Sequence, residues 1–117
     1  MSETFDAIII GAGQAGPPLV ERLTQGGMKA ALIERHLIGG TCVNSGCMPT
    51  KALVASARAA RVVRGAGAWG VDILGEIAID MKTIKARADA VTANARNGLE
   101  AWLGGLEGCT LVRGHAC

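Results

Sequence analysis

A glycine-rich turn between a short apolar run and a helical pattern constrains this chain more than any other feature. The run AIII occupies residues 7–10, and its β-branched residues predict a strand buried on both faces. The spacing GxGxxG follows over residues 11–16, and a helical pattern then extends to a glycine pair at 26–27. A second apolar run at 30–33 predicts another strand. Together these features predict a βαβ unit over residues 5–35, with parallel strands and a right-handed crossover.

This context makes the glycine motif a specific prediction of a nucleotide-binding turn. Gly11 permits the sharp turn, Gly13 lets the backbone approach a pyrophosphate, and Gly16 lets the helix pack close to the strand. The N-terminus of the helix offers free N–H groups and a positive dipole to phosphates. Glu34 can accept hydrogen bonds from a ribose diol and would repel a 2′-phosphate, which favours FAD or NAD over NADP. The alternative is a glycine-rich turn that has only a packing role.

Pro17 and Pro18 lie close to the start of the predicted helix. Proline is tolerated without cost only in the first helical turn, where the N–H groups lack helical partners. If the helix begins near Gln14, Pro18 lies at the limit of that turn. We therefore expect an irregular or kinked first turn.

The rest of the chain predicts further helices and a third strand. Residues 39–64 begin as a loop and continue into an alanine-rich helix, whose arginines we interpret as a solvated face. Asp80 is the expected N-cap of a long amphipathic helix over 80–104, and residues 109–116 are expected to contain a strand. The apolar stripe of the long helix consists of Ile84, Ala88, Val91, Ala95, Leu99 and Trp102.

Composition and charge limit the class of protein. A chain of 117 residues forms one domain at most, and its 50% hydrophobic content and net charge of +2 argue against disorder. The same charge balance gives no strong attraction to nucleic acid or membranes. The acidic N-terminus lacks the basic region of a signal peptide, so the cytoplasm is the expected location. Four cysteines in that compartment favour catalytic, metal-binding or buried thiols over structural disulfides.

Cys42 and Cys47 form the second motif. Five residues of regular helix rise about 7.5 Å, whereas a disulfide needs its Cα atoms within about 7 Å. A regular helix would hold the sulfurs apart, but Gly46 and Pro49 could loosen this turn. The nearby helix N-terminus and Lys51 favour thiolates. Spacing alone leaves a redox dithiol, two buried structural thiols, or half of a zinc site that would be completed by Cys109, His115 and Cys117.

Residues 39–51, GGTCVNSGCMPTK, resemble the redox-active signature of the pyridine nucleotide-disulfide oxidoreductases, which include glutathione reductase, dihydrolipoamide dehydrogenase and mercuric reductase. The GxGxxG turn with Glu34 resembles the FAD motif of this family, and residues 114–116 resemble its third FAD-contacting strand. The resemblance covers essentially the whole chain. It implies an α/β fold, namely a Rossmann-like FAD-binding domain with a parallel sheet. Residues 1–117 would be the N-terminal part of that domain, left incomplete, with the NAD(P)H and dimerisation domains absent.

The resemblance also implies roles for individual residues. Cys42 would be the outer thiol that attacks the substrate, and Cys47 would be the inner thiol stacked on the flavin. Lys51 would lie near the flavin N5, although some relatives carry a lysine one position earlier, where this chain has Thr50. No metal ligand is implied. The residues expected to contact FAD are Gly11, Gly13, Gly16, Glu34, Gly40, Thr41, Lys51, His115 and Ala116.

The function implied by the resemblance is electron transfer. Electrons would pass from NAD(P)H through FAD to a Cys42–Cys47 disulfide, and then to a small-molecule thiol, disulfide or metal-ion substrate. We expect the fragment alone to be inactive, a homodimer only for the full-length enzyme, and no nucleic-acid or membrane partner. The alternative is a nucleotide-binding module with buried non-redox thiols.

Overall fold

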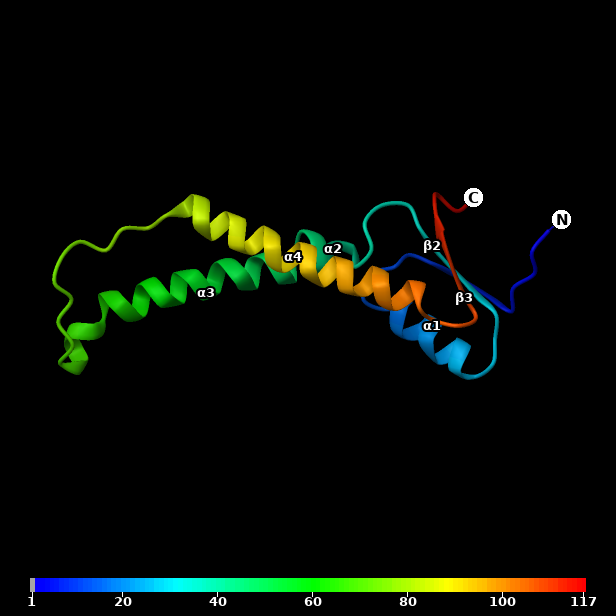
Figure 1. Cartoon of the computed structure of the whole chain (residues 1–117), viewed down its shortest axis with the longest axis horizontal. Coiled ribbons are helices and arrows are strands. Elements are labelled where there is room, and N and C mark those ends of the chain that lie inside the picture. Colours follow the sequence, from blue (N-terminus) through cyan, green and yellow to red (C-terminus); the bar gives the residue numbers. More distant parts are fainter. Residues whose placement is uncertain (1) are drawn as a thin grey trace.

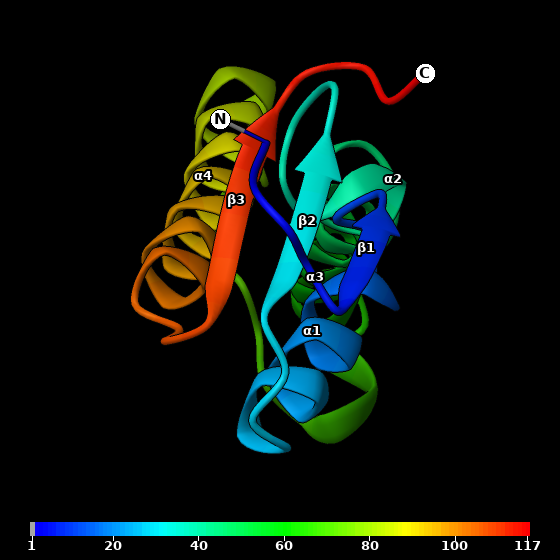
Figure 2. The ribbon, with the colours of Figure 1, turned by 90° about the vertical axis from the view of Figure 1, so that its right-hand side faces the viewer.

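The computed structural model describes residues 2–117, which form a small sheet at one end of a long pair of helices (Figure 1). Strands β1 (Ala7–Ile10), β2 (Ala30–Glu34) and β3 (Cys109–Arg113) are all parallel and lie in the order β1-β2-β3. The strands are aligned side by side in Figure 2, with β2 between its two neighbours. The predicted α/β fold with a parallel sheet is therefore confirmed.

Helix α1 (Gly16–Gln25) connects β1 to β2 and begins in close contact with the end of β1. A Cβ atom on Gly16 would lie 2.1 Å from the carbonyl oxygen of Gly11 and 3.3 Å from Cδ1 of Leu32. No side chain fits at that distance, so glycine lets the helix lie directly against the sheet. The close approach expected at Gly16 is present in the structure.

The first turn of α1 is regular, so the expectation of an irregular or kinked turn at Pro17 and Pro18 was wrong. The helix begins at Gly16, two residues later than the assumed start, and both prolines lie in its first turn. The backbone N–H groups in the first turn of a helix have no helical partner. The N–H groups that the two prolines lack therefore cost the helix no hydrogen bond. The N–H of Leu19, the first residue after the prolines, donates to the Ala15 carbonyl at 3.2 Å.

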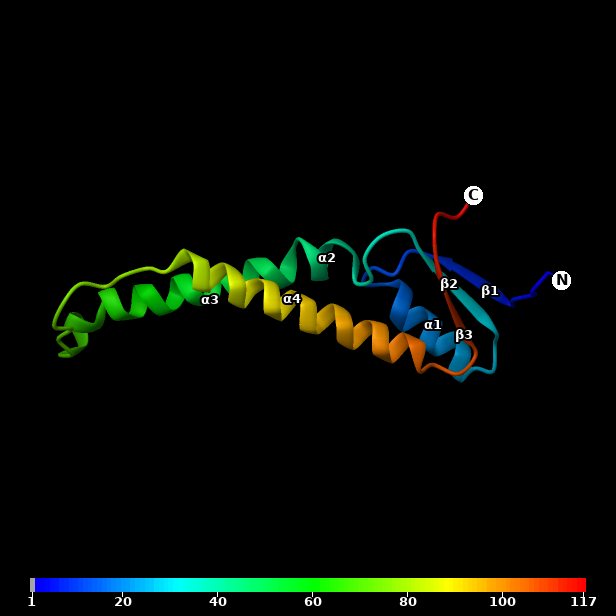
Figure 3. The ribbon, with the colours of Figure 1, turned by 45° about the horizontal axis from the view of Figure 1, so that its top comes forward.

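Two antiparallel helices form an arm that extends away from the sheet. Helix α2 (Gly40–Asn44) leads into α3 (Cys47–Arg64), and a short 3-10 helix, η1 (Ala66–Trp69), precedes the linker to α4 (Met81–Gly104). Figures 1 and 3 show the first part of α4 beside the half of α3 that is nearer the sheet, while the linker runs back along the outer half of α3. The chain consequently measures 70 × 25 × 20 Å. Within residues 2–117, no helix combines the length and the apolar character that a membrane span requires.

Asp80 caps α4, as the sequence predicts. Its Oδ1 accepts hydrogen bonds from the backbone N–H groups of Lys82 and Thr83, at 3.0 and 3.1 Å. The hydrogen bond from the Thr83 hydroxyl, with those of the backbone, holds the pKa of the Asp80 carboxyl below its usual value. The cap therefore stabilises the end of the helix that lies farthest from the sheet.

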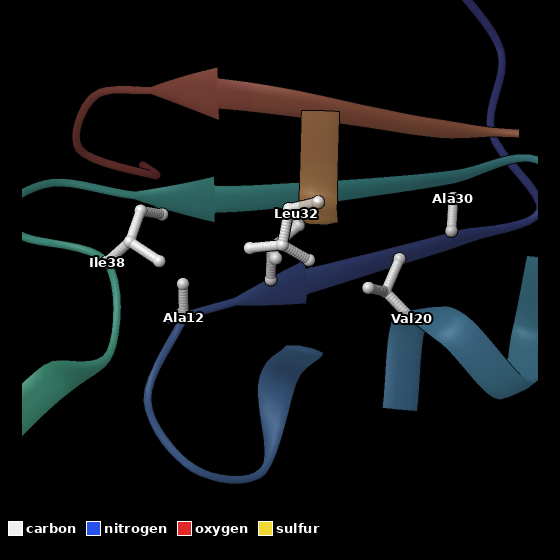
Figure 4. Packing of buried hydrophobic residues seen from close by; sticks show 6 residues of the cluster. Ala12, Val20, Ala30, Leu32 and Ile38 are labelled. Atoms are coloured by element: carbon white, nitrogen blue, oxygen red, sulfur yellow. The ribbon is translucent and has the colours of Figure 1, made fainter. Parts of the chain in front are cut away.

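The helices gather behind one face of the sheet in Figure 2, and this arrangement decides which strand is buried. Leu32 on the central strand is completely buried, whereas Ile8 and Ile10 on the edge strand are 62% and 74% exposed. The prediction that the first strand is buried on both faces was therefore wrong for this chain. Five of the six core residues are labelled in Figure 4, and the full set is Ala12, Val20, Ala30, Leu32, Ile38 and Leu103.

Candidate functional site

A cavity of about 540 Å³ lies at the carboxyl ends of the three strands. Its walls come from the ends of β1 and β2, from α2, and from the segment that follows β3. Open parallel sheets bind their ligands at this edge, because the loops there leave a crevice. Six of the predicted site residues line the cavity, namely Gly11, Glu34, Gly40, Thr41, His115 and Ala116.

Glu34 connects the end of β2 to the glycine turn. Its Oε2 accepts a hydrogen bond from the Ala12 N–H at 2.9 Å, and its Oε1 accepts one from the His36 N–H at 2.8 Å. These hydrogen bonds, that of His36 first, hold the pKa of the Glu34 carboxyl below its usual value. Each carboxylate oxygen keeps a further lone pair, so the group can still accept hydrogen bonds from a ligand in the cavity.

The glycine turn leaves open space and unused donors where the sequence predicts a pyrophosphate. A Cβ atom on Gly13 would meet no other atom within 4 Å, so the backbone there is open to a ligand. Within residues 2–117, the N–H groups of Gly13, Gln14 and Ala15 form no hydrogen bond. Since the two prolines remove donors from the first turn of α1, the donors available to an anion lie in the turn itself. These features fit a phosphate group.

The segment that carries the cysteines lies directly against the glycine turn. The Gly39 N–H donates to the Ala12 carbonyl at 2.7 Å. A Cβ atom on Gly40 would lie only 2.9 Å from Cα of Gly13, and Gly40 has a positive φ of 60°. Both the conformation and the close contact favour glycine at this position. The glycine turn and the cysteine segment therefore form one continuous surface.

Cys42 and Cys47 form a disulfide, with their Cα atoms 4.6 Å apart. The structure divides residues 39–64 into two helices, because α2 ends at Asn44 and α3 begins at Cys47. Between the helices, the Gly46 N–H donates to the Thr41 carbonyl at 2.6 Å. A Cβ atom on Gly46 would lie 3.0 Å from that same oxygen. The glycine lets the chain fold back on itself and brings together the two sulfurs that a regular helix would separate.

The disulfide helps to distinguish the three interpretations of the cysteine pair, namely a redox dithiol, two buried structural thiols and half of a zinc site. A bonded pair with Cys47 exposed differs from two buried, unreactive thiols. In the part of the chain that the structure describes, no three His, Cys, Asp or Glu side chains gather as a metal site would require. Of the cysteines proposed to complete a zinc site, Cys109 is half-buried in β3 and Cys117 is exposed. The geometry therefore favours the redox interpretation.

The remaining predicted residues lie outside the cavity wall. Gly16 is buried under the turn, and Lys51 is exposed on α3 beyond the disulfide. The sequence analysis missed four polar residues that line the cavity, each within two positions of a predicted residue. The signal in the sequence that could have identified them is their proximity to Glu34, Cys42 and Cys47. They are Arg35, His36, Asn44 and Ser45.

Comparisons with known proteins agree with this site. A profile of the pyridine nucleotide-disulphide oxidoreductases matches residues 5–107. The dihydrolipoyl dehydrogenase of Chlamydia muridarum (strain MoPn / Nigg) is 43% identical over 99 residues, which cover 85% of this chain and 21% of that protein. The dihydrolipoyl dehydrogenase of Thermus scotoductus (strain ATCC 700910 / SA-01) is 36% identical over 114 residues, covering 97% of this chain and 24% of that protein.

A solved structure agrees as well. The Cu(II) complex of RclA, an HOCl-induced flavoprotein disulfide reductase from Escherichia coli, superimposes with a TM-score of 0.74 and 30% sequence identity. The match covers 98% of this chain and 22% of that one. The chain thus spans about a fifth to a quarter of the length of these proteins. On the profile match and the shared fold, the chain belongs to the pyridine nucleotide-disulphide oxidoreductase family.

Proposed function

We propose that this chain supplies the FAD-binding turn and the redox disulfide of an oxidoreductase that takes electrons from NAD(P)H. Members of its family use FAD and NAD(P)H. One observation carries the proposal. Gly40 and Thr41 line the cavity at the sheet edge, and the next residue along the chain is Cys42 of the disulfide. The expected cofactor site and the redox pair are therefore joined in one segment.

Each part of the cavity fits one part of FAD. The open turn at Gly13 would receive the pyrophosphate, and Glu34 would accept hydrogen bonds from the adenosine ribose. The backbone at His115 and Ala116 would border the adenine, while Lys51 would lie toward the flavin. When bound, FAD supplies a two-electron carrier between a nicotinamide and the disulfide.

The cysteines then perform thiol–disulfide exchange. Two electrons and two protons convert the Cys42–Cys47 disulfide into a dithiol. The Cys42 thiolate attacks one sulfur of a substrate disulfide and forms a mixed disulfide, which releases the first substrate thiol. The Cys47 thiolate then attacks the Cys42 sulfur, which re-forms the protein disulfide and releases the second substrate thiol. The protein ends the exchange oxidised by two electrons, and the substrate ends it reduced by two.

The related proteins suggest the class of substrate. Two of them are named dihydrolipoyl dehydrogenases and one is named a disulfide reductase, so we propose a small-molecule dithiol or disulfide. The same reductase is described as a Cu(II) complex, which makes a metal-ion substrate the second candidate. We further propose that the full-length enzyme is a cytoplasmic homodimer and that the present chain alone does not turn over NADH.

Cofactor binding is tested on the purified chain. FAD is added, unbound flavin is removed by desalting, and the visible absorbance of the retained flavin is measured. We expect the wild type and Asp72→Ala, a control in the exposed linker, to retain flavin, and Glu34→Ala to retain much less. Wild-type protein that retains no flavin would contradict the proposed cofactor site. NADH-dependent turnover by the chain alone would contradict its proposed inactivity.

The redox role is tested by counting thiols. Cys109→Ser and Cys117→Ser are introduced together, because both residues are free cysteines. We expect no free thiols before reduction, two after reduction, and none again after reoxidation with glutathione disulfide. Two thiols that resist reoxidation would support the nucleotide-binding module with non-redox thiols instead.

A further inference from the structure

Both polar atoms of the Asn44 side-chain amide, between the two cysteines, take part in hydrogen bonds. Its Nδ2 donates to the carbonyl oxygens of Ile38 and Gly40, both at 2.9 Å. Its Oδ1 accepts a hydrogen bond from Nη1 of Arg96 at 3.0 Å. The reversed orientation of the amide would turn its oxygen toward two carbonyl oxygens and its NH₂ toward a guanidinium, so the three partners fix a single orientation.

Arg96 comes from α4, which is 52 residues further along the chain. It is half-buried, and it belongs to none of the ion pairs within residues 2–117. Its charge is directed at a neutral amide rather than at a carboxylate. A hydrogen bond from a charged donor is stronger than one between neutral groups, so this contact ties α2 firmly to α4.

Helix α2 depends on such contacts. It has five residues, far fewer than an isolated helix needs for stability in water. Val43 is buried on one side, and Asn44 bonds to the carbonyl groups at and before the start of the helix. Cys42 lies in the middle of this helix, so the contacts of α2 determine where its sulfur lies relative to Cys47.

We propose that Arg96 and Asn44 are positioning residues for the redox disulfide. Arg96 fixes the amide of Asn44, which holds α2 folded and keeps Cys42 within bonding distance of Cys47. The pair therefore shifts the thiol–disulfide equilibrium of the protein toward the disulfide. This inference rests on the proposed redox function of the two cysteines.

The equilibrium is measured with glutathione in the Cys109→Ser/Cys117→Ser background. The protein disulfide and two glutathione molecules give the protein dithiol and one glutathione disulfide, so electrons and protons balance. We expect Arg96→Met to shift this equilibrium about tenfold toward the dithiol, which corresponds to ~1.4 kcal/mol. Arg96→Lys keeps a cationic donor, so its equilibrium should lie closer to that of the wild type than the equilibrium of Arg96→Met does.

Arg87 offers a matched control on the same helix. Its Nη1 donates to the Ala52 carbonyl at 3.2 Å, so its hydrogen bond joins α4 to α3 and not to α2. We expect Arg87→Met to leave the glutathione equilibrium unchanged even if it lowers the thermal stability. An equal shift in Arg87→Met and Arg96→Met would show a general loss of stability and would overturn the proposal.

A double-mutant cycle tests whether Arg96 and Asn44 act together on the glutathione equilibrium. Because Arg96 acts through Asn44, the shift of Asn44→Ala/Arg96→Met should be no larger than that of Asn44→Ala alone. Independent, additive shifts would refute the coupling, as would an unchanged equilibrium in Arg96→Met, or in Asn44→Ala if Arg96→Met does not fold. A wild-type chain that forms no Cys42–Cys47 disulfide at any glutathione ratio would instead contradict the proposed redox function itself.

Discussion

Gly13 and Gly40 bring two separate motifs into direct backbone contact, since a Cβ atom on Gly40 would lie 2.9 Å from Cα of Gly13. Gly13 belongs to the glycine turn after β1, and Gly40 begins the helix that carries Cys42. No side chain separates the two segments at this point. The position of the cysteine helix is therefore set by the glycine turn.

Gly40→Ala should destabilise the protein by about 1–3 kcal/mol, because the new methyl group meets backbone that has little freedom to move. The positive φ of 60° at this residue adds to the cost. Gly13→Ala is the control, since its methyl group would meet no atom within 4 Å. Urea unfolding of both variants checks the prediction, and equal losses of stability would contradict it.

Leu32→Ala should cost about 2–5 kcal/mol of unfolding free energy, because the leucine is completely buried in the central strand. Ile10→Ala, on the neighbouring strand, should change stability by less than about 0.5 kcal/mol, because Ile10 is 74% exposed. Denaturant unfolding of the two variants measures both effects. A comparable loss in Ile10→Ala would mean that another surface covers β1 in solution.

Glu34 should make the stability of the protein depend on acid pH. Backbone N–H donors lower its pKa in the folded state, so its contribution is fully present above the unfolded pKa of about 4.3. That contribution is lost as the pH falls through the folded pKa. Glu34→Gln should be less stable than the wild type at pH 7, and the difference should shrink at lower pH. Urea unfolding across this range, with Asp72→Asn as the control, would reveal a constant difference if the carboxylate had no such role.

Reduction of the Cys42–Cys47 disulfide should lower the unfolding free energy by roughly 2 kcal/mol, because the bond closes a short loop in the unfolded chain. Thermal unfolding with and without a reductant, in the background that lacks the other two cysteines, measures the change. Cys42→Ser/Cys47→Ser should match the reduced protein. A double variant as stable as the oxidised wild type would contradict the prediction.

Much of the fold follows from local signals in the sequence. The βαβ unit, the Asp80 cap and the long helix after it depend on neighbouring residues, and all three are present. The burial of β1 could not be inferred from its residues alone. Ile8 and Ile10 have the character of a buried strand, but exposure depends on which elements flank the sheet, and no element within residues 2–117 covers them.

In the candidate site, too, local features could be predicted from the sequence, whereas features that depend on tertiary contacts could not. The glycine turn and the cysteine pair could be found from spacing, because each is a local device. The break between α2 and α3 depends on how closely Gly46 approaches the Thr41 carbonyl, and spacing does not report that distance. The bond from Arg96 to Asn44 joins residues 52 positions apart, and no local pattern indicates it.

The long arm of α3 and α4 determines how this molecule moves through solution. Its radius of gyration is 20.6 Å, whereas a compact chain of this length has a value of about 13 Å. Such a rod-like particle experiences more friction than a sphere of equal mass. A single copy will therefore elute early from a sizing column, and an apparent mass calibrated on spheres would suggest a dimer where sedimentation equilibrium finds a monomer.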